Sequence, residues 1–261
     1  MRDLFDLTDR VAVITGGVGV LGLQFAHALA ERGAHIVLAD LDQTTCDQCA
    51  AKIGAEYETA SLGIACDVAK PEDVARLVDR TMAEYGRIDV LVNNAATQPP
   101  GFFTPLEEYS LDAWNEVLAV NLTGMFLVAQ AVGKVMVNQK KGSIINIASI
   151  YGIGGPDHRV YAGCEFNTPA AYAVSKAGVI GLTKYLATYW ADKGVRVSAI
   201  TPGGVYRNHE DPFLSAYEAH VPMGRMAEEH EISGAVVYLA SDASSYVTGH
   251  NLIVDGGWTA W

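Results

Sequence analysis

A chain of 261 residues, 50% of them hydrophobic and 18% charged, is long enough to fold as one large domain without disulfides or metals. Its 18 Lys and Arg against 30 Asp and Glu give a net charge of −12. That charge repels nucleic acid and anionic lipid, so neither is an expected partner. The negative charge does not exclude small phosphate ligands, because backbone N–H groups at a helix N-terminus can bind them.

The start of the chain and the cysteines indicate a reduced, cytoplasmic setting. Charges interrupt the first seven residues, so we expect no signal peptide, and the longest uncharged helical stretch, Val117 to Gly133, is too short and polar to span a membrane. Cys46 and Cys49 have the Cys-x-x-Cys spacing, but a zinc site would need a second close pair. We therefore expect free thiols and no metal.

Apolar runs bounded by turn residues alternate with longer helical stretches, one of which opens at Pro71. Several runs are apolar on successive residues, which is typical of parallel strands buried on both faces. The predicted strands are Val11–Thr15, His35–Ala39, Ser61–Ala65, Ile88–Val92, Ser143–Ala148, Arg196–Ile200 and Asn251–Val254. The alternation predicts a single α/β domain over residues 1–261: a doubly wound parallel sheet of the Rossmann type, about seven strands, with helices on both faces. Such sheets bind ligands at the carboxyl ends of their strands.

The end of the first predicted strand has the features of a dinucleotide site. Gly16, Gly17, Gly19 and Gly22 follow it, and glycines there let the backbone approach a pyrophosphate at the start of the next helix, expected at Gly22. Asp40 ends the second strand, where a carboxylate can accept the adenosine ribose hydroxyls and repel a 2′-phosphate. We expect NAD rather than NADP, since no Lys or Arg lies between His35 and Lys52.

Four motifs in order resemble the short-chain dehydrogenase/reductase family over essentially the whole chain. They are Thr15–Gly22, Asn93-Asn94-Ala95-Ala96, Ser149, and Tyr172 with Lys176. The sequence departs from the family at Val20, where a glycine is usual, and at Ala96. The resemblance implies cofactor contacts from Gly16, Gly19, Val20, Leu21, Gly22, Asp40, Leu41, Asp67, Val68, Asn94, Ala95, Tyr172, Lys176, Pro202, Gly203 and Val205. For Asp67, a helix-capping role before Pro71 is nearly as well supported.

The same resemblance implies a catalytic set of Asn121, Ser149, Tyr172 and Lys176. Tyr172 and Lys176 are four apart on a predicted helix, Pro169 to Trp190, and share a face. A nearby ammonium and an oxidised nicotinamide favour the phenolate, so Tyr172 is expected to act as the base. Ser149 would hydrogen-bond the reacting oxygen. Asn121 would support a water relay to the lysine, or would be a core amide satisfied by backbone.

The segment between Ser149 and Tyr172 is longer than in most single-domain members of the family. Residues 151–167 should hang over the active-site mouth and read a polyhydroxylated or anionic ligand, or else serve subunit contacts. Residues 207–223 are expected to form a loop-like lid. Arg207 would meet cofactor or substrate anions, or stay solvated. The expected substrate contacts are Ser149, Tyr151, His158, Arg159, Tyr172, Gly204 and Arg207.

Residues 151–167, together with Ser244–Gly249 and Asp255–Trp261, resemble those of family members acting in flagellin modification and sugar metabolism. This implies an NAD-dependent oxidoreductase acting on a secondary hydroxyl or hemiacetal carbon of a sugar or sugar derivative, with an anionic substrate held by Arg159 as one form of the prediction. Family analogy implies a homotetramer built on Leu111–Asn138 and Pro169–Trp190. The alternatives are a carbonyl reductase for acyl or other lipid-like substrates and a non-catalytic dinucleotide sensor. An epimerase or dehydratase would need a separate substrate domain, for which the chain leaves little room.

Overall fold

The computed structural model describes residues 3–261, so Met1 and Arg2, part of the segment searched for a signal peptide, lie outside the described residues. Within that range the strands form a seven-stranded parallel sheet in the order β3-β2-β1-β4-β5-β6-β7. They are β1 (Val11–Thr15), β2 (His35–Asp40), β3 (Ser61–Ala65), β4 (Val90–Asn93), β5 (Gly142–Ile147), β6 (Val195–Pro202) and β7 (Asn251–Val254). Every predicted strand is present, some with ends shifted by one or two residues, which confirms the predicted fold class.

Helices connect the strands as the sequence pattern predicts. They are α1 (Val20–Ala30), α2 (Gln43–Tyr57), α3 (Pro71–Tyr85), α4 (Leu111–Leu118), α5 (Met125–Gln139), α6 (Ala170–Trp190), α7 (Phe213–Glu218) and α8 (Ser233–Ala240). Two boundaries need correction. The first helix begins at Val20 rather than Gly22, because Gly19 already has extended backbone angles and serves as the N-cap. The helix expected from Pro169 begins one residue later, with Pro169 as its N-cap.

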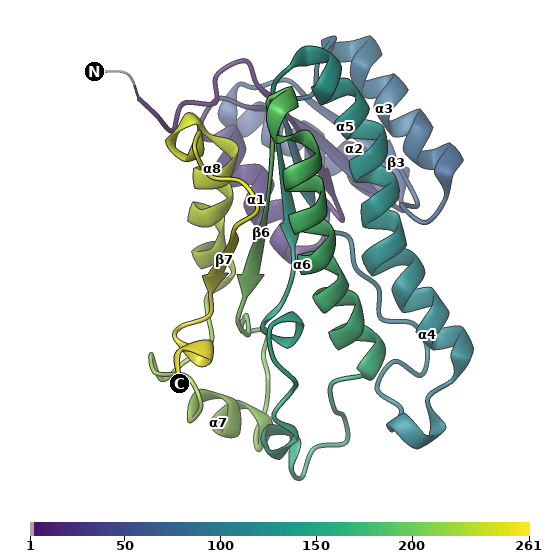
Figure 1. Cartoon of the computed structure of the whole chain (residues 1–261), viewed down its shortest axis with the longest axis vertical. Helices are drawn as coiled ribbons and strands as arrows, with labels where there is room; N and C mark the ends of the chain where they lie inside the picture. Colours follow the sequence, from purple (N-terminus) through teal and green to yellow (C-terminus); the bar gives the residue numbers. More distant parts are fainter. Residues whose placement is uncertain (1–2) are drawn as a thin grey trace.

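The sheet separates two apolar cores. On one face α1, α2 and α8 pack through residues such as Phe25 and Val236, and on the other α3, α5 and α6 pack through residues such as Leu77 and Val132. The helices α5 and α6 approach closely because Gly133 faces the indole ring of Trp190, which leaves no room for a Cβ atom. Figure 1 shows α1 and α8 on one side of the strands and α5 and α6 on the other.

The helical stretch expected at Leu111–Asn138 is present and ends one residue later. α4, a π-helical turn at Ala119–Gly124 and α5 follow one another without a break, so Leu111–Gln139 forms 29 residues that meet a length and hydropathy test for a membrane span. The stretch nevertheless packs against the sheet and against α3 and α6, and 44% of its most apolar window is buried. The core helix of a soluble protein meets the same test.

The carboxyl ends of the strands carry the segments that surround the site. The strand order reverses between β1 and β4, which places the predicted binding crevice at those two strands. Residues 151–167 and α7 lie together beyond this edge, at the lower end of the molecule in Figure 1. The expectation of a loop at 207–223 needs correction, because Phe213 and Tyr217 bury their rings and form α7.

Candidate active site

The turn after β1 is built around glycine and held by an asparagine. Gly16 has φ +60, and a Cβ atom there would lie 2.9 Å from the Ala95 Cα atom. The side-chain amide of Asn94 donates to the carbonyl oxygens of Thr15 and Gly16, at 3.1 and 3.0 Å. A Cβ atom on Gly22 would overlap the carbonyl oxygen of Gly16. The N-terminus of α1 therefore sits close to the turn, with its first N–H groups free of intrahelical partners.

Asp40 joins this turn to the end of β2. Its carboxylate accepts the backbone N–H groups of Val18 at 3.1 Å and Leu41 at 2.9 Å. Each carboxylate oxygen keeps a lone pair that can accept a further hydrogen bond. The carboxylate is thus positioned at the mouth of the crevice with capacity to bind a pair of hydroxyl groups.

A cavity of about 940 Å³ runs along the carboxyl edge past this turn. Almost every residue expected to contact a cofactor lines it: Gly16, Gly19, Val20, Leu21, Asp40, Leu41, Asp67, Val68, Asn94, Ala95, Tyr172, Lys176, Pro202, Gly203 and Val205. Gly22 does not, because it lies beneath the turn. Gln98, Glu116 and Ala119 also line this cavity and were missed, since they belong to irregular segments or helix faces without a recognisable motif.

The Ser149, Tyr172 and Lys176 side chains meet at one end of this cavity. Lys176 is 3% exposed, and its Nζ atom donates to the Ile147 carbonyl oxygen at 2.8 Å and lies 5.6 Å from the centre of the Tyr172 ring. Burial lowers the pKa of Lys176 to about 8. Burial raises the pKa of Tyr172, and a hydrogen bond from Ser149 acts in the opposite direction. In the protein alone, burial outweighs this hydrogen bond and the Tyr172 pKa lies above its usual value. The lowering expected from the ammonium and an oxidised nicotinamide together stays a prediction.

Asn121 lies outside the cavities and holds the surrounding backbone. It is fully buried in the π-helical turn, and its Oδ1 atom accepts the Thr97 N–H group at 2.9 Å. Its Nδ2 atom is 3.5 Å from the Ser175 hydroxyl, on the helix that carries Tyr172 and Lys176. Such π-helical turns occur frequently at functional sites. Asn121 thus connects the segment after β4 to α6, and its predicted water relay stays a prediction.

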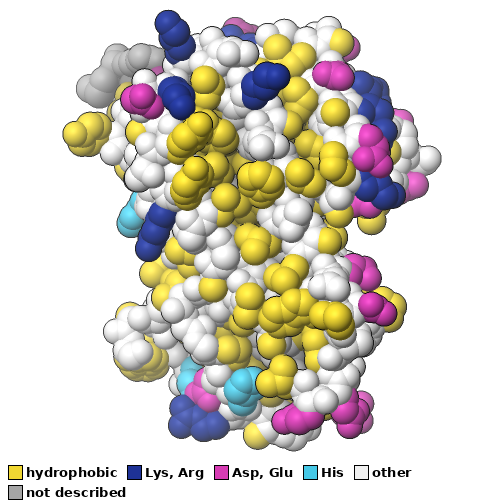
Figure 2. All heavy atoms as spheres, turned by 45° about the vertical axis from the view of Figure 1, so that its right-hand side comes forward, with side chains coloured by type: hydrophobic (Ala, Val, Ile, Leu, Met, Phe, Trp, Pro, Cys, Tyr) yellow, Lys and Arg dark blue, Asp and Glu magenta, His cyan; other side chains and the backbone are white. Residues whose placement is uncertain are grey.

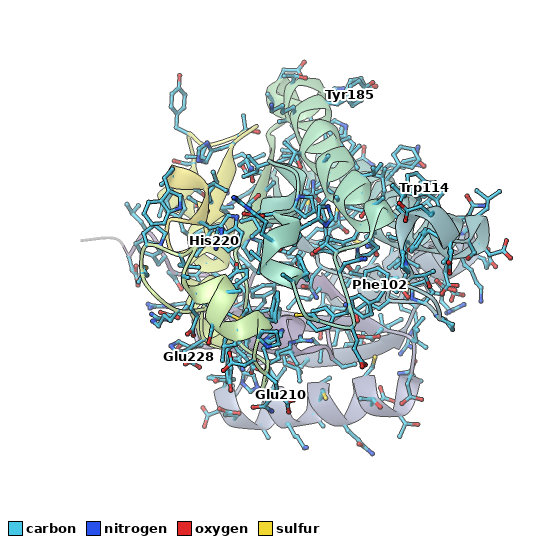
Figure 3. The ribbon with its side chains drawn as sticks, turned by 90° about the horizontal axis from the view of Figure 1, so that it is seen from below. Phe102, Trp114, Tyr185, Glu210, His220 and Glu228 are labelled. Carbon is cyan, nitrogen blue, oxygen red and sulfur yellow. The ribbon has the colours of Figure 1, made fainter. Side chains whose placement is uncertain are left out.

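A second cavity, of about 330 Å³, adjoins the first, and Ser149 and Tyr172 line both. Its walls are mainly aromatic: Phe102, Phe103, Tyr151, Tyr161, Phe166, Phe213 and Tyr217. Among these only Tyr151 was expected from the sequence, together with Gly204, which also lines it. The clustering of aromatic residues in the loops after β4 and β5 is a sequence signal that could have found Phe102, Phe103, Tyr161 and Phe166. Phe213 and Tyr217 follow β6 and lie on α7, outside those loops. Figure 3 views this edge, with Phe102 and His220 on different sides of it.

His158 and Arg159 do not take part in this site, which corrects the prediction. Arg159 is 85% exposed, and its guanidinium pairs with the Asp157 carboxylate at 2.7 Å, two residues earlier in the same turn. Neither residue lines either cavity. The Asp157 carboxylate pairs with the Arg159 guanidinium that we expected to contact the substrate. Asp157 also contacts His220 at 3.0 Å and so connects residues 151–167 to the segment after α7.

Arg207 lines the first cavity and not the second. It is exposed, and its backbone N–H group donates to the His209 ring at 3.1 Å. Its contact with a cofactor or substrate anion stays a prediction. The second cavity holds no Lys, Arg, Asp or Glu among the described residues that line it.

Comparison with known proteins agrees with this geometry. A family model described as "Enoyl-(Acyl carrier protein) reductase" matches residues 19–259. The chain belongs to the short-chain dehydrogenase/reductase family. It is therefore an oxidoreductase of that family, and its relatives support action on hydroxyl groups.

Three proteins that are similar to this chain are dehydrogenases with different named substrates. D-threitol dehydrogenase of Mycolicibacterium smegmatis is 39% identical over 98% of this chain and 95% of its own length. A gluconate 5-dehydrogenase from Burkholderia cenocepacia, solved with NADP and tartrate, is 35% identical with a TM-score of 0.91, covering 99% of this chain and 98% of that one. An NAD⁺-bound xylitol dehydrogenase is 34% identical with a TM-score of 0.87, covering 96% and 99%.

The first cavity fits a nicotinamide dinucleotide. Gly16 and Gly22 leave no space for a Cβ atom, so the turn keeps its backbone open toward the cavity, and Asp40 stands at one end with Lys176 at the other. The first turn of α1 would hold the pyrophosphate and Asp40 the adenosine ribose. When bound, the dinucleotide would exchange a hydride with the substrate carbon, and its oxidised form would add a positive charge that favours the Tyr172 phenolate.

Replacing Gly22 tests the turn. We expect Gly22→Ala to weaken dinucleotide binding tenfold or more, because the new Cβ atom would displace the Gly16 carbonyl and the turn above it. Fluorescence titration with NADH measures the dissociation constant. Gly234→Ala in α8, where nothing lies within 4 Å of the position that the new methyl group would take, is the matched control. Equal affinity for both variants would show that the turn does not hold the dinucleotide.

Proposed function

We propose that this protein is an NAD-dependent dehydrogenase that oxidises a secondary hydroxyl, or a hemiacetal carbon, of an uncharged polyol or sugar. The observation that carries this proposal is the position of Ser149 and Tyr172. Both line the dinucleotide-sized cavity and the smaller aromatic cavity beside it. A substrate in the aromatic cavity would meet these two hydroxyls at the boundary between the cavities.

Each catalytic side chain has a separate task in this proposal. Tyr172 takes the proton of the substrate hydroxyl, and Ser149 holds the same oxygen while its charge develops. Lys176 contributes charge beside Tyr172 and a donor toward the cofactor ribose. Asn121 keeps Thr97 and the α6 helix in place around them.

The substrate class follows from the second cavity. Its aromatic walls suit the C–H faces of a polyol or a sugar ring, and no Lys or Arg among the described residues that line it would offset a buried carboxylate. The threitol and xylitol dehydrogenases named above support a polyol substrate. An anionic sugar is no longer favoured, since the guanidinium of Arg159 lies elsewhere. A panel of threitol, xylitol, glycerol and gluconate, followed by NADH absorbance, tests the proposal. Failure of every alcohol with both cofactors would contradict it.

The NAD preference is supported by Asp40. The cations that line the first cavity are Lys176 and Arg207, both away from the β2 end, so no described basic residue there would neutralise a 2′-phosphate. We expect the kcat/KM of the wild type to favour NAD over NADP at least tenfold. Asp40→Asn should reduce this NAD-to-NADP ratio tenfold or more, because it removes the charge that repels the 2′-phosphate and keeps an acceptor oxygen. A tenfold change in the ratio corresponds to about 1.4 kcal/mol.

Steady-state kinetics with both dinucleotides checks the cofactor preference. Asp79→Asn, an exposed acid on α3 outside the cavity, is the matched control and should leave the ratio unchanged. A wild type that uses NADP as efficiently as NAD would contradict the role proposed for Asp40. The comparison matters because the similar gluconate 5-dehydrogenase was solved with NADP.

The assembly is proposed as a cytoplasmic homotetramer. The helices α4, α5 and α6 carry exposed apolar side chains, including Phe126, Val174, Tyr185 and Tyr189. Figure 2 shows hydrophobic side chains gathered on the face that these helices cover. Contiguous apolar surface of this kind is typical of a subunit interface. Sedimentation of the purified protein tests this assembly.

A further inference from the structure

Three hydroxyl groups form a hydrogen-bonded chain on the wall of the second cavity. The Tyr151 and Tyr161 hydroxyl oxygens are 2.6 Å apart, and the Thr168 hydroxyl is hydrogen-bonded to Tyr161. All three side chains line the cavity, as does Tyr172. The chain therefore faces the space where a substrate would meet the catalytic tyrosine.

The hydroxyls of this chain keep hydrogen-bonding capacity for a ligand. Besides the two bonds above, the Tyr151 and Thr168 side chains also have a hydrogen-bonding interaction, so the three hydroxyls pair with one another. Each hydroxyl oxygen has two lone pairs, so lone pairs are left that can accept a hydrogen bond from a group in the cavity. Tyr217 adds a donor, because its oxygen accepts the Gly204 N–H group and its own hydrogen has no acceptor within residues 3–261.

The cavity keeps these groups as neutral donors. Burial raises the pKa of Tyr151 and of Tyr161, and it raises the pKa of Tyr217 to about 12. Burial also lowers the pKa of His209, which lines the same cavity and so stays uncharged at neutral pH. A ligand here finds hydroxyl donors and no compensating charge, which favours uncharged oxygen atoms over a carboxylate.

The remaining walls restrict the ligand further. The rings of Phe103, Phe166 and Phe213 lie in edge-on contact with one another, with centroids 5.8 and 5.4 Å apart along the series. Phe102 contacts the ring of Tyr172 at 6.2 Å. A molecule that fits both the hydroxyl chain and the phenylalanine rings has apolar C–H faces and more than one hydroxyl.

We propose that the Tyr151–Tyr161–Thr168 chain recognises a hydroxyl of the substrate other than the one oxidised. The enzyme then selects uncharged diols and polyols over alcohols with a single hydroxyl. This inference rests on the proposed function and assigns the recognition to residues that the catalytic set does not include.

The test removes the central hydroxyl and compares matched substrates. Tyr161→Phe is assayed with threitol against 2-butanol and with 1,2-cyclohexanediol against cyclohexanol, each pair sharing a carbon skeleton. We expect the wild type to prefer the compound with more hydroxyls. The variant should lose about tenfold or more of its kcat/KM for that compound and keep its efficiency on the single alcohol, because only the former uses the chain.

The controls separate recognition from folding. Tyr246→Phe, at a fully exposed position, should change neither substrate. Thr168→Val removes the end hydroxyl at nearly constant volume and should act in the same direction, and it decides the question if Tyr161→Phe does not fold. An unchanged ratio, or an equal loss on both members of a pair, overturns the inference while leaving the dehydrogenase intact. A wild type inactive on all four alcohols with both cofactors overturns the proposed function instead.

Discussion

Tyr172→Phe is expected to lower the kcat of alcohol oxidation by about 10²–10⁴-fold, because it removes the group that accepts the substrate proton. The ring itself would remain, and with it the packing against Phe102. Dinucleotide affinity should therefore stay within a few fold of the wild type. Stopped-flow or steady-state NADH absorbance gives the rate, and fluorescence titration gives the affinity.

A matched control for this variant lies on the surface of the same protein. Tyr206→Phe changes an exposed ring that lines neither cavity, so it should leave the rate unchanged. A Tyr172→Phe enzyme that kept most of the wild-type rate would show that another group takes the proton. Burial that raises the Tyr172 pKa also predicts that the oxidation rate of the wild type climbs with pH, since the phenolate is the active form.

Lys176→Met should stabilise the fold at pH 7 while it removes most of the activity. Burial lowers the pKa of Lys176 from 10.5 to about 8, so the folded state binds this proton less tightly than the unfolded state. Below pH 8 the charged lysine therefore lowers the free energy of unfolding by about 3 kcal/mol. Losing the bond to the Ile147 carbonyl offsets about 1 kcal/mol of the gain.

The sign of this effect can be checked with pH. Between pH 8 and 10.5 the unfolded chain holds the proton and the folded chain has released it, so wild-type stability rises through this range and the advantage of Lys176→Met shrinks. Urea unfolding at pH 7 and pH 10 measures both values. Lys52→Met, at an exposed position on α2, is the control. A variant less stable than the wild type at pH 7 would mean that the ammonium is stabilised by its surroundings.

The fold and the cofactor end of the site could be predicted because their signals are local. Each strand is a short apolar run, and parallel strands place their carboxyl ends at one edge, so the turn at Gly16 and the acid at Asp40 had to meet there. The four-residue spacing of Tyr172 and Lys176 on one helix likewise implied that they share a face. These features depend on neighbours in sequence or on the sheet order alone.

The sequence by itself therefore determined the doubly wound sheet, the crevice at its carboxyl edge and the proximity of Tyr172 and Lys176 in that crevice. Only the tertiary structure decided what surrounds the substrate. Phe102, Tyr161 and Phe213 come from three separate segments, and no local periodicity brings them together. Arg159 was predicted to contact the substrate but lies outside both cavities. Asp157, two residues earlier in the same turn, pairs with its guanidinium at the surface. The wall of a cavity depends on which distant loops pack together, and that depends on the burial of whole side chains.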